Sequence, residues 1–341
     1  MKKRFLTLLL VSAIAVVSLT GCGTDTPAKK TTKEASTKIE QPYKISVIIK
    51  ATDSDYWQTL LLGAKAAEKD NKGKVVVTTD GPPSEINIDK QVSILENVIA
   101  TKPAGIVIAS TSTDATVPAV EEAMGNGIPV ITIDNKLTTD KYTSFLATDH
   151  SKAAGMAATA MVNDWKKMKI DLTGKKVIVI SSVAGTKVNG DRTEGFIKKI
   201  KELVPGIKVL ETQYADNDIT KALNITQNTI SANPDLIGIF GDNNHMGVGI
   251  AKGLEEAKKQ NSIVAYAFDA DADEVAALKN GVLRGLVVQD PFGMGYQGVI
   301  AAINAIEGKK VEKDVIVEAT IISKENMNEE KNKKLLNPTG K

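Results

Sequence analysis

The sequence predicts an α/β protein with two doubly wound lobes, each built on a parallel sheet that helices cover on both faces. Short β-branched runs alternate with amphipathic helical patterns at regular spacing, which is typical of a doubly wound parallel sheet. The same alternation occurs in two consecutive halves of the chain. Without its first 42 residues the chain has about 300 residues, enough for two domains of the usual size.

The first strand, turn and helix occupy residues 44–65. The Ile and Val residues of 45–49 are typical of a strand buried on both faces. Asp53 can cap the following helix, and Tyr56 and Trp57 come next, in a chain with only 4% aromatic residues. Because ligands bind at the carboxyl ends of strands in open α/β sheets, we expect this pair to form a stacking platform. The alternative is that the pair packs in the core.

Apolar runs and a 3.6-residue period predict the other elements of the first half. Ile88, Val92 and Leu95 lie on one stripe of a helix, and Gly125-Asn126-Gly127 ends the next helix because glycine tolerates the left-handed backbone of a helix stop. The predicted strands are 74–79, 105–109 and 128–134, and the predicted helices are 84–101 and 117–124.

The second half repeats the alternation. Asp149 can cap an alanine-rich helix that runs to Trp165. The predicted strands are 176–181, 208–214, 236–240, 263–268 and 283–289, and the predicted helices are 192–203, 219–231, 246–259 and 273–280. A helix at 294–306 and a strand at 315–321 close the fold, and residues 324–341 form a polar tail with little predicted structure.

The N-terminus has the pattern of a sorting signal. Residues 1–4 are basic, and the apolar run at 5–19 is shorter than the roughly 20 residues of a membrane-spanning helix. Leu19-Thr20-Gly21-Cys22 resembles the lipobox of bacterial lipoproteins, and Cys22 is the only cysteine. We therefore predict a lipid on Cys22 that anchors the protein to the cell membrane on its extracytoplasmic side. The alternative is an ordinary signal peptide, and residues 23–42 predict a flexible tether in either case.

Composition and motifs argue against several functional classes. The 43 Lys and Arg residues nearly balance the 41 Asp and Glu residues, so we expect no nucleic-acid partner. The two histidines, His150 and His245, lack the spacing of a zinc site. Residues 269–273 mimic the start of a calcium loop, but Glu274 and Asn280 replace its required Gly and Glu. With no nucleophile elbow either, we predict no metal, no cofactor, no catalytic residue and no enzyme activity.

Polar and aromatic side chains gather just past the predicted strand ends. Carboxylates and amides hydrogen-bond in fixed planes, which suits paired hydroxyl groups, and aromatic rings suit the C–H faces of a sugar ring. The pattern predicts carbohydrate recognition. The residues are Asp53, Tyr56, Trp57, Asp134, Asn135, Asp149, Asn217, Asn243, Asp269 and Gln289.

Four segments carry a resemblance to a known family. They are Pro129-Val130-Ile131-Thr132-Ile133-Asp134, Ala184-Gly185-Thr186 with Arg192-Thr193-Glu194-Gly195-Phe196, Tyr214-Ala215-Asp216-Asn217-Asp218, and Phe268-Asp269. From Tyr43 to about Ile321 the chain resembles the type I periplasmic sugar-binding proteins of the ribose-binding class. The resemblance implies a monomer whose lobes close on a monosaccharide or related polyol and whose closed form docks on the permease of an ABC importer.

The resemblance also implies how the chain is divided. Three hinge crossings are expected near Ala147-Thr148, Gln289-Asp290 and Glu318-Ala319. The expected parts are a signal peptide with lipobox at 1–22, a tether at 23–42, an N-terminal lobe at 43–147 plus 290–318, a C-terminal lobe at 148–289 plus 319–325, and a polar tail at 326–341.

The family's ligand-binding residues carry over position by position. Its aromatic pair falls on Tyr56 and Trp57, its carboxylates on Asp134 and on Asp269 beside Phe268, its second-lobe asparagine on Asn243 and its hinge glutamine on Gln289. Asp53, Asn135, Asp149 and Asn217 complete the expected ligand-binding set.

Four positions depart from the family pattern. Asn135 and Gly190 replace arginines, Ala109 replaces an asparagine, and Asn217 replaces an aromatic residue. A pocket with two acids and no nearby cation argues against ribose and favours a hexose, polyol or amino sugar. Arg192 could swing in as a substitute, although its place in the motif favours a structural ion pair.

Two other functions remain open at this stage. The same fold could serve a receptor for a small polyhydroxylated signal, such as a furanosyl autoinducer. Alternatively, Gly293-Met294-Gly295-Tyr296-Gln297-Gly298 fits the G-x-G-x-x-G pattern of a nucleotide-dependent enzyme. Asp290-Pro291-Phe292 separates that segment from the preceding strand, which argues against a phosphate-binding turn.

Overall fold

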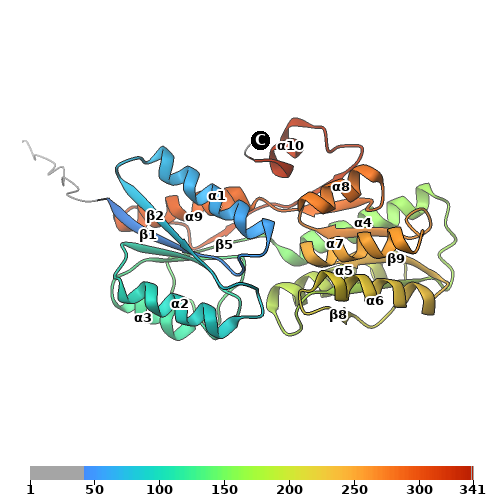
Figure 1. Cartoon of the computed structure of the whole chain (residues 1–341), viewed down its shortest axis with the longest axis horizontal. Helices are drawn as coiled ribbons and strands as arrows, with labels where there is room; N and C mark the ends of the chain where they lie inside the picture. The colour runs from blue at the N-terminus through green and yellow to red at the C-terminus, as the bar shows by residue number, and fades with distance from the viewer. Residues whose placement is uncertain (1–41, 339, 341) are drawn as a thin grey trace, which may run out of the picture. The chain divides into compact units, whose positions relative to one another are not determined.

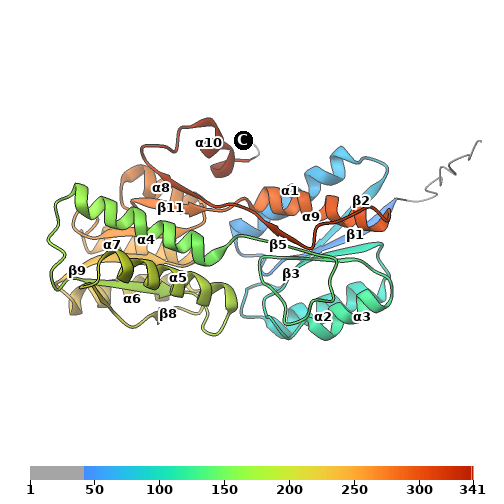
Figure 2. The same cartoon turned by 180° about the vertical axis from the view of Figure 1, so that it is seen from behind.

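The computed structural model describes residues 42–338 and 340, so the predicted signal, lipobox and most of the tether lie outside the described residues. The described part contains two α/β lobes, which confirms the predicted fold class (Figures 1 and 2). Among the described residues, no helix is both long enough and apolar enough to cross a membrane.

The N-terminal lobe is built on a six-stranded parallel sheet in the order β12-β5-β4-β3-β1-β2. Its strands are β1 (Tyr43–Ile48), β2 (Val75–Asp80), β3 (Gly105–Ala109), β4 (Val130–Ile133), β5 (Ser144–Ala147) and β12 (Asp314–Ile316). Helices α1 (Asp55–Asp70) and α9 (Pro291–Ile306) cover one face, and α2 (Ile88–Ala100) and α3 (Val117–Gly125) cover the other. Both faces are therefore buried, and in β1 Ile45 and Val47 pack on one side while Ile48 packs on the other.

The C-terminal lobe has a sheet in the order β13-β11-β10-β9-β6-β7, with β8 also paired to β6. Only β13 runs antiparallel to its neighbour. The strands are β6 (Lys176–Ser181), β7 (Lys208–Val209), β8 (Gln213–Tyr214), β9 (Leu236–Gly241), β10 (Val264–Phe268), β11 (Gly285–Val288) and β13 (Thr320–Ser323). Helices α4 (His150–Lys167) and α5 (Lys187–Leu203) cover one face, and α6 (Ile219–Ala232), α7 (Asn244–Glu256) and α8 (Ala272–Asn280) cover the other.

The chain passes from one sheet to the other at three places. They lie between β5 and α4, between β11 and α9, and between β12 and β13. Helix α9 thus returns to the N-terminal lobe after the C-terminal lobe has been built, and it lies beside α1 (Figures 1 and 2).

Several elements differ from the sequence-based expectation. Strand β5 was not expected, because the sequence Ser-Phe-Leu-Ala has no β-branched residue. The strand expected at 315–321 is two strands in different sheets, and the strand expected at 208–214 is the short pair β7 and β8. The tail contains α10 (Glu330–Leu336), whose Leu335 and Leu336 pack on the core of the C-terminal lobe.

The glycines of the G-x-G-x-x-G segment serve helix packing. The segment lies inside α9, which begins at Pro291, so it forms no loop ahead of a helix. A Cβ on Gly295 would lie 2.0 Å from the carbonyl oxygen of Leu60 in α1, and a Cβ on Gly63 would lie 1.9 Å from that of Phe292 in α9. The two helices interlock through these glycines, which removes the structural basis of the nucleotide-site hypothesis.

We expect Gly295→Ala to destabilise the protein by about 1–3 kcal/mol, because α1 and α9 must separate to admit the methyl group. Chemical denaturation measures this as a lower midpoint. Gly125→Ala is the matched control, since its Cβ would meet nothing within 4 Å, and it should change stability by no more than about 0.5 kcal/mol. Equal effects of the two substitutions would contradict the interlock.

Candidate functional site

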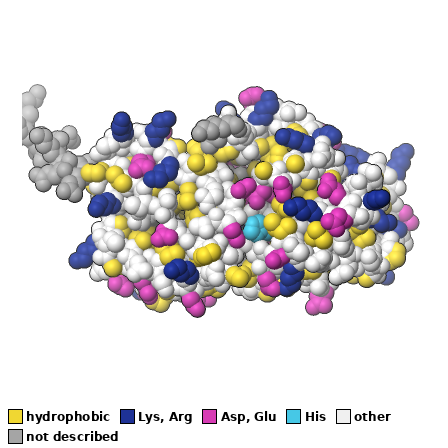
Figure 3. All heavy atoms as spheres, viewed as in Figure 1, with side chains coloured by type: hydrophobic (Ala, Val, Ile, Leu, Met, Phe, Trp, Pro, Cys, Tyr) yellow, Lys and Arg dark blue, Asp and Glu magenta, His cyan; other side chains and the backbone are white. Residues whose placement is uncertain are grey.

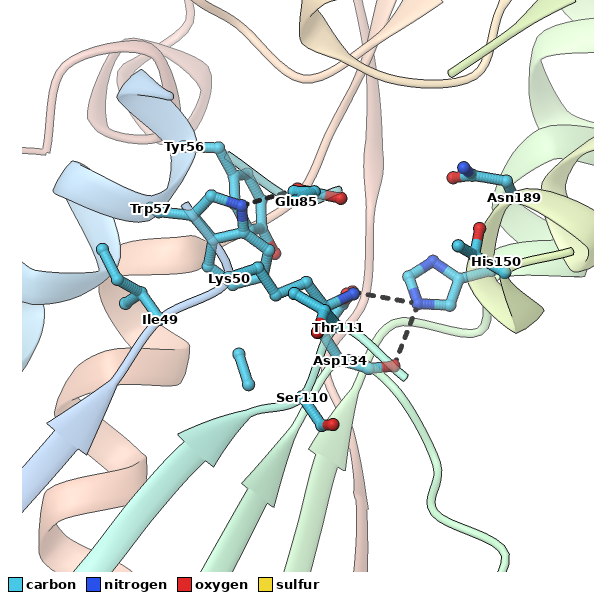
Figure 4. Close-up of polar contacts among 12 residues, drawn as sticks. Ile49, Lys50, Tyr56, Trp57, Glu85, Ser110, Thr111, Asp134, His150 and Asn189 are labelled. Atoms are coloured by element: carbon cyan, nitrogen blue, oxygen red, sulfur yellow. Dashed lines mark hydrogen bonds and ion pairs between the residues drawn. The ribbon is translucent and has the colours of Figure 1, made fainter. Parts of the chain in front are cut away.

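A cavity lies at the carboxyl ends of strands from both sheets. Residues of both lobes and of the β11–α9 crossing line it, as expected for ligand sites in open α/β sheets. The lining residues are Lys50, Ser54, Tyr56, Trp57, Glu85, Thr111, Asp134, Thr186, Val188, Asn189, Arg192, Asn243, Asn244, Asp269 and Gln289. Figure 4 shows part of this set, and Figure 3 shows charged side chains of both signs interspersed over one face of the molecule.

Asp134 and Asp269 occupy equivalent places in the two lobes. Each is the first residue after a strand, β4 or β10, and each has a left-handed backbone, with φ of 67° and 78°. The amide of Asp134 still donates to Leu146 O (2.8 Å), and that of Asp269 donates to Val287 O (2.9 Å). Aspartate is one of the few residue types that tolerates this conformation, which turns both carboxylates into the cavity.

Asp134 is a buried carboxylate with a basic side chain close to each of its oxygens. Lys50 Nζ lies 2.6 Å from its Oδ2, and His150 Nε2 lies 3.1 Å from its Oδ1 (Figure 4). Burial alone would raise the pKa of Asp134, but Lys50, with His150 and Arg192, holds it well below its usual range. Asp134 is therefore ionised at neutral pH.

Arg192 is fixed in the wall of the C-terminal lobe. Its guanidinium carbon lies 4.0 Å from the ring centroid of Phe268, its Nη1 donates to the backbone oxygen of Asp242 (2.8 Å), and its Nε donates to Nδ1 of His150 (3.2 Å). These contacts are a cation–π stack and hydrogen bonds to neutral acceptors. The expectation of a structural ion pair for Arg192 is not met, and the expectation of a pocket without a nearby cation is wrong, because Lys50 and Arg192 both line the cavity.

Tyr56 and Trp57 pack in the core of the N-terminal lobe, as the alternative held, and they also line the cavity; the stacking of a ligand on them stays a prediction. Their rings meet edge to face, with centroids 4.7 Å apart. Trp57 Nε1 donates to Glu85 Oε1 (2.8 Å), which fixes the indole at the cavity.

Asp269 carries the second acid of the cavity. Gln289 Nε2 donates to its Oδ1 (2.7 Å). Burial raises the pKa of Asp269 to about 6, against the opposing effect of Arg192. The two carboxylates of the cavity thus differ: Asp134 forms an ion pair with a lysine, and Asp269 accepts a hydrogen bond from a glutamine amide.

The structure does not place five of the expected binding residues on the cavity. Asp53 is solvent-exposed, and its neighbour Ser54 takes the inward position. Asp149 is exposed and caps α4 by accepting from the amide of Lys152 (3.0 Å). Asn135, Asn217 and Phe268 are buried and do not line the cavity.

Two of these buried residues support lining residues. Asn217 Oδ1 accepts from Asn243 Nδ2 (2.8 Å), and Phe268 lies beneath Arg192. His245 is buried and contacts Asn217 O through Nδ1 (2.9 Å), away from the cavity lining.

Sequence reasoning missed several lining residues. Lys50 closely follows the apolar run of β1, so the strand-end rule that found Asp134 could also have found it. Glu85 lies in the turn between β2 and α2, and Asn189 and Asn244 lie in the first turns of α5 and α7, where no local pattern singles them out. The other missed lining residues are Ser54, Thr111, Thr186 and Val188, whereas Arg192, named above as a possible substitute for the absent arginines, does line the cavity.

Two α/β lobes that line one polar cavity at their strand ends define a two-lobed binding protein. Residues 45–310 match the family of the periplasmic binding protein domain. The chain belongs to this family, in the type I branch that contains the sugar-binding proteins of ABC transporters.

Individual relatives span nearly the whole described body. The chain is 30% identical over 280 residues to the ribose import binding protein of Haemophilus influenzae, which covers 82% of this chain and 91% of that protein. A carbohydrate transporter solute-binding protein from Agrobacterium radiobacter, solved with D-arabinose, is 37% identical with a TM-score of 0.83 and covers 87% of this chain and 99% of that one. An ABC transporter solute-binding protein from Agrobacterium vitis with bound D-fucose is 33% identical with a TM-score of 0.80, covering 86% and 99%.

We expect Lys50→Met to destabilise the protein by about 3 kcal/mol, because it leaves the Asp134 carboxylate buried without its ammonium partner. Since the low pKa of Asp134 stabilises the fold at neutral pH and this contribution is lost in acid, the deficit should shrink as pH falls. Denaturation at several pH values measures it.

Asp134→Asn supplies the control for this prediction, because asparagine also tolerates the left-handed backbone. In the Asp134→Asn background, Lys50→Met should lower the free energy of unfolding clearly less than it does in the wild type. If the two substitutions had additive effects on stability, the Lys50–Asp134 pair would be contradicted.

Proposed function

We propose that this protein is the extracytoplasmic substrate-binding lipoprotein of an ABC importer for a monosaccharide or related polyol. The observation that carries the proposal is one cavity lined from both lobes by aromatic rings, carboxylates and amides. Relatives described as binding ribose, D-arabinose and D-fucose support the substrate class.

The hydrogen bonds of the described residues favour a neutral, hydroxyl-rich ligand. Lys50 is paired with Asp134, and Arg192 donates from Nε and Nη1, so each cation keeps further N–H donors. Asn189 donates through Nδ2 to Ser182 Oγ (2.7 Å) and Val183 O (3.1 Å), and Asn244 donates through Nδ2 to Ser54 Oγ and Asp271 Oδ2 (both 2.9 Å). Both asparagines thus keep an amide oxygen for the ligand, and sugar hydroxyls donate to such acceptors.

The cations in the cavity change the argument about ribose. The earlier reason against ribose was a pocket that lacks a cation, and Lys50 and Arg192 remove that reason. We include ribose among the candidate ligands together with arabinose and fucose.

Ligand binding is coupled to closure of the lobes in this proposal. A sugar that contacts Trp57 and Asp134 in one lobe and Asp269 in the other stabilises the arrangement in which all three meet it. The permease then distinguishes the loaded form from the empty one.

A titration with ribose, arabinose, fucose, allose and glucose tests the proposal. The chain has two tryptophans, and only Trp57 lines the cavity, so a bound sugar should change the emission of Trp57. We expect Trp57→Ala to weaken binding at least about tenfold through loss of ring stacking. Calorimetry measures the affinity.

Trp165→Phe is the control, because Trp165 is buried in the core of the C-terminal lobe. It should keep the fluorescence response. If no sugar of the panel binds and a furanosyl signal does, the protein is a signal receptor. If Trp57→Ala binds its sugar with unchanged affinity, the stacking role of Trp57 is contradicted.

The lipid anchor is a separate part of the proposal and rests on the Leu19-Thr20-Gly21-Cys22 segment. Cys22→Ser should release the protein from the membrane fraction, because a serine hydroxyl cannot form the thioether to diacylglycerol. Mass spectrometry of the purified protein should show the lipid on the native chain alone. Thr24→Ser, two residues along, should leave both readouts unchanged, and a membrane-bound Cys22→Ser protein would contradict the anchor.

A further inference from the structure

His150 connects the two lobes beside the cavity without lining it. It is the first residue of α4, directly after the first crossing, and only 6% of its surface is exposed. Its ring contacts Asp134 of the N-terminal lobe (Figure 4) and Arg192 of the C-terminal lobe. Both of these neighbours line the cavity.

The partners of the ring select one neutral tautomer. The Nε–H of Arg192 donates to Nδ1 of His150 at 3.2 Å, so Nδ1 must present its lone pair. The ring hydrogen then lies on Nε2, which contacts the backbone oxygen of Asp134 at 3.4 Å and lies 3.1 Å from its carboxylate Oδ1. Neutral His150 therefore accepts from a donor in one lobe and donates to the backbone oxygen of Asp134 in the other.

Protonation breaks this arrangement on one side only. A hydrogen on Nδ1 would point at the Nε–H of Arg192, so two donors and two positive charges would meet. The contact with Asp134 would remain. Arg192 would be the group that leaves, although its stack on Phe268 and its bond to Asp242 O hold it from other sides.

We propose that His150 is a positioning residue for the ligand cavity, which in its neutral form holds Arg192 and Asp134 in the binding arrangement and on protonation releases Arg192. This inference rests on the proposed function. It makes ligand affinity depend on the protonation of His150, a residue that does not line the cavity.

The charged groups around His150 come from three elements. Arg192 faces it from α5, Asp134 from the end of β4, and Lys50 from the end of β1. Burial lowers the pKa of His150, and Arg192 and Lys50 act in the same direction, while Asp134 opposes them. The neutral form is therefore present at neutral pH, and acidification through the lowered pKa removes it.

The tautomer can be read directly from the protein without a sugar. The chain has only two histidines, so nitrogen NMR of the imidazoles, assigned with a His245→Asn variant, resolves His150. We expect the Nε2–H form at pH 7.5 and a pKa below 6.5. An Nδ1–H tautomer or a pKa above 6.5 would overturn the proposal whatever the ligand is.

Binding of the best sugar of the panel tests the positioning role. Wild-type affinity should fall by up to about tenfold per pH unit below the pKa of His150. Asp269 and Asp242, whose pKa values burial raises to about 6 and about 7, titrate nearby, so the comparison is between variants at each pH. His150→Asn keeps an uncharged acceptor for Arg192, and its affinity should be less dependent on pH and within about threefold of wild type at pH 7.5.

Two further variants complete the test. His150→Ala removes both contacts and should weaken binding by about tenfold at pH 7.5. His245→Asn should keep the acid-side loss of the wild type. A His150→Asn protein with the wild-type pH slope would overturn the proposal, and failure of the wild type to bind any sugar would contradict the proposed function while leaving the NMR result to decide the role of His150.

Discussion

The cavity depends on one buried carboxylate, that of Asp134. Burying a charge is costly unless it is paired, and its charge partner is Lys50 in the same lobe, 2.6 Å away. His150 of the other lobe lies 3.1 Å from the second carboxylate oxygen, so groups of both lobes surround this charge. Asp269, in the equivalent place of the second sheet, has a glutamine amide as its partner, so the two acids differ in chemistry although the fold repeats.

The packing of α1 against α9 connects the core to this site. Gly63 and Gly295 let the two helices approach closely, and α1 carries Tyr56 and Trp57 in its first turn. Helix α9 enters the N-terminal lobe directly after Gln289, which touches Asp269. The glycines that resemble a nucleotide motif thus help to set the aromatic wall of the cavity relative to the crossing.

The sequence was sufficient for the fold because both lobes repeat one alternation of buried strands and amphipathic helices. It was sufficient for Tyr56, Trp57, Asp134, Asn243, Asp269 and Gln289 because strand ends meet at one edge of a sheet. It was not sufficient where a shift of one residue decides which side chain faces the cavity: Asp53 is exposed, and its neighbour Ser54 points inward. It was also not sufficient for short strands such as β5. Pairing with the neighbouring strands β4 and β12 stabilises β5, whereas its own residues have little strand propensity.

The replaced arginines show that the charges of a site depend on which side chains meet in the fold, and not only on the residues at the family's positions. Asn135 and Gly190 stand where the resembling family has arginines, yet the cavity has two cations, one from the end of β1 and one from α5. The protein itself already uses both, through Asp134 for Lys50 and through His150, Asp242 and Phe268 for Arg192. Each cation still keeps N–H donors beyond these contacts, and the amide oxygens of Asn189 and Asn244 remain as acceptors. The walls therefore present both donors and acceptors, and a neutral polyol, whose hydroxyl groups donate and accept, is the ligand that completes them.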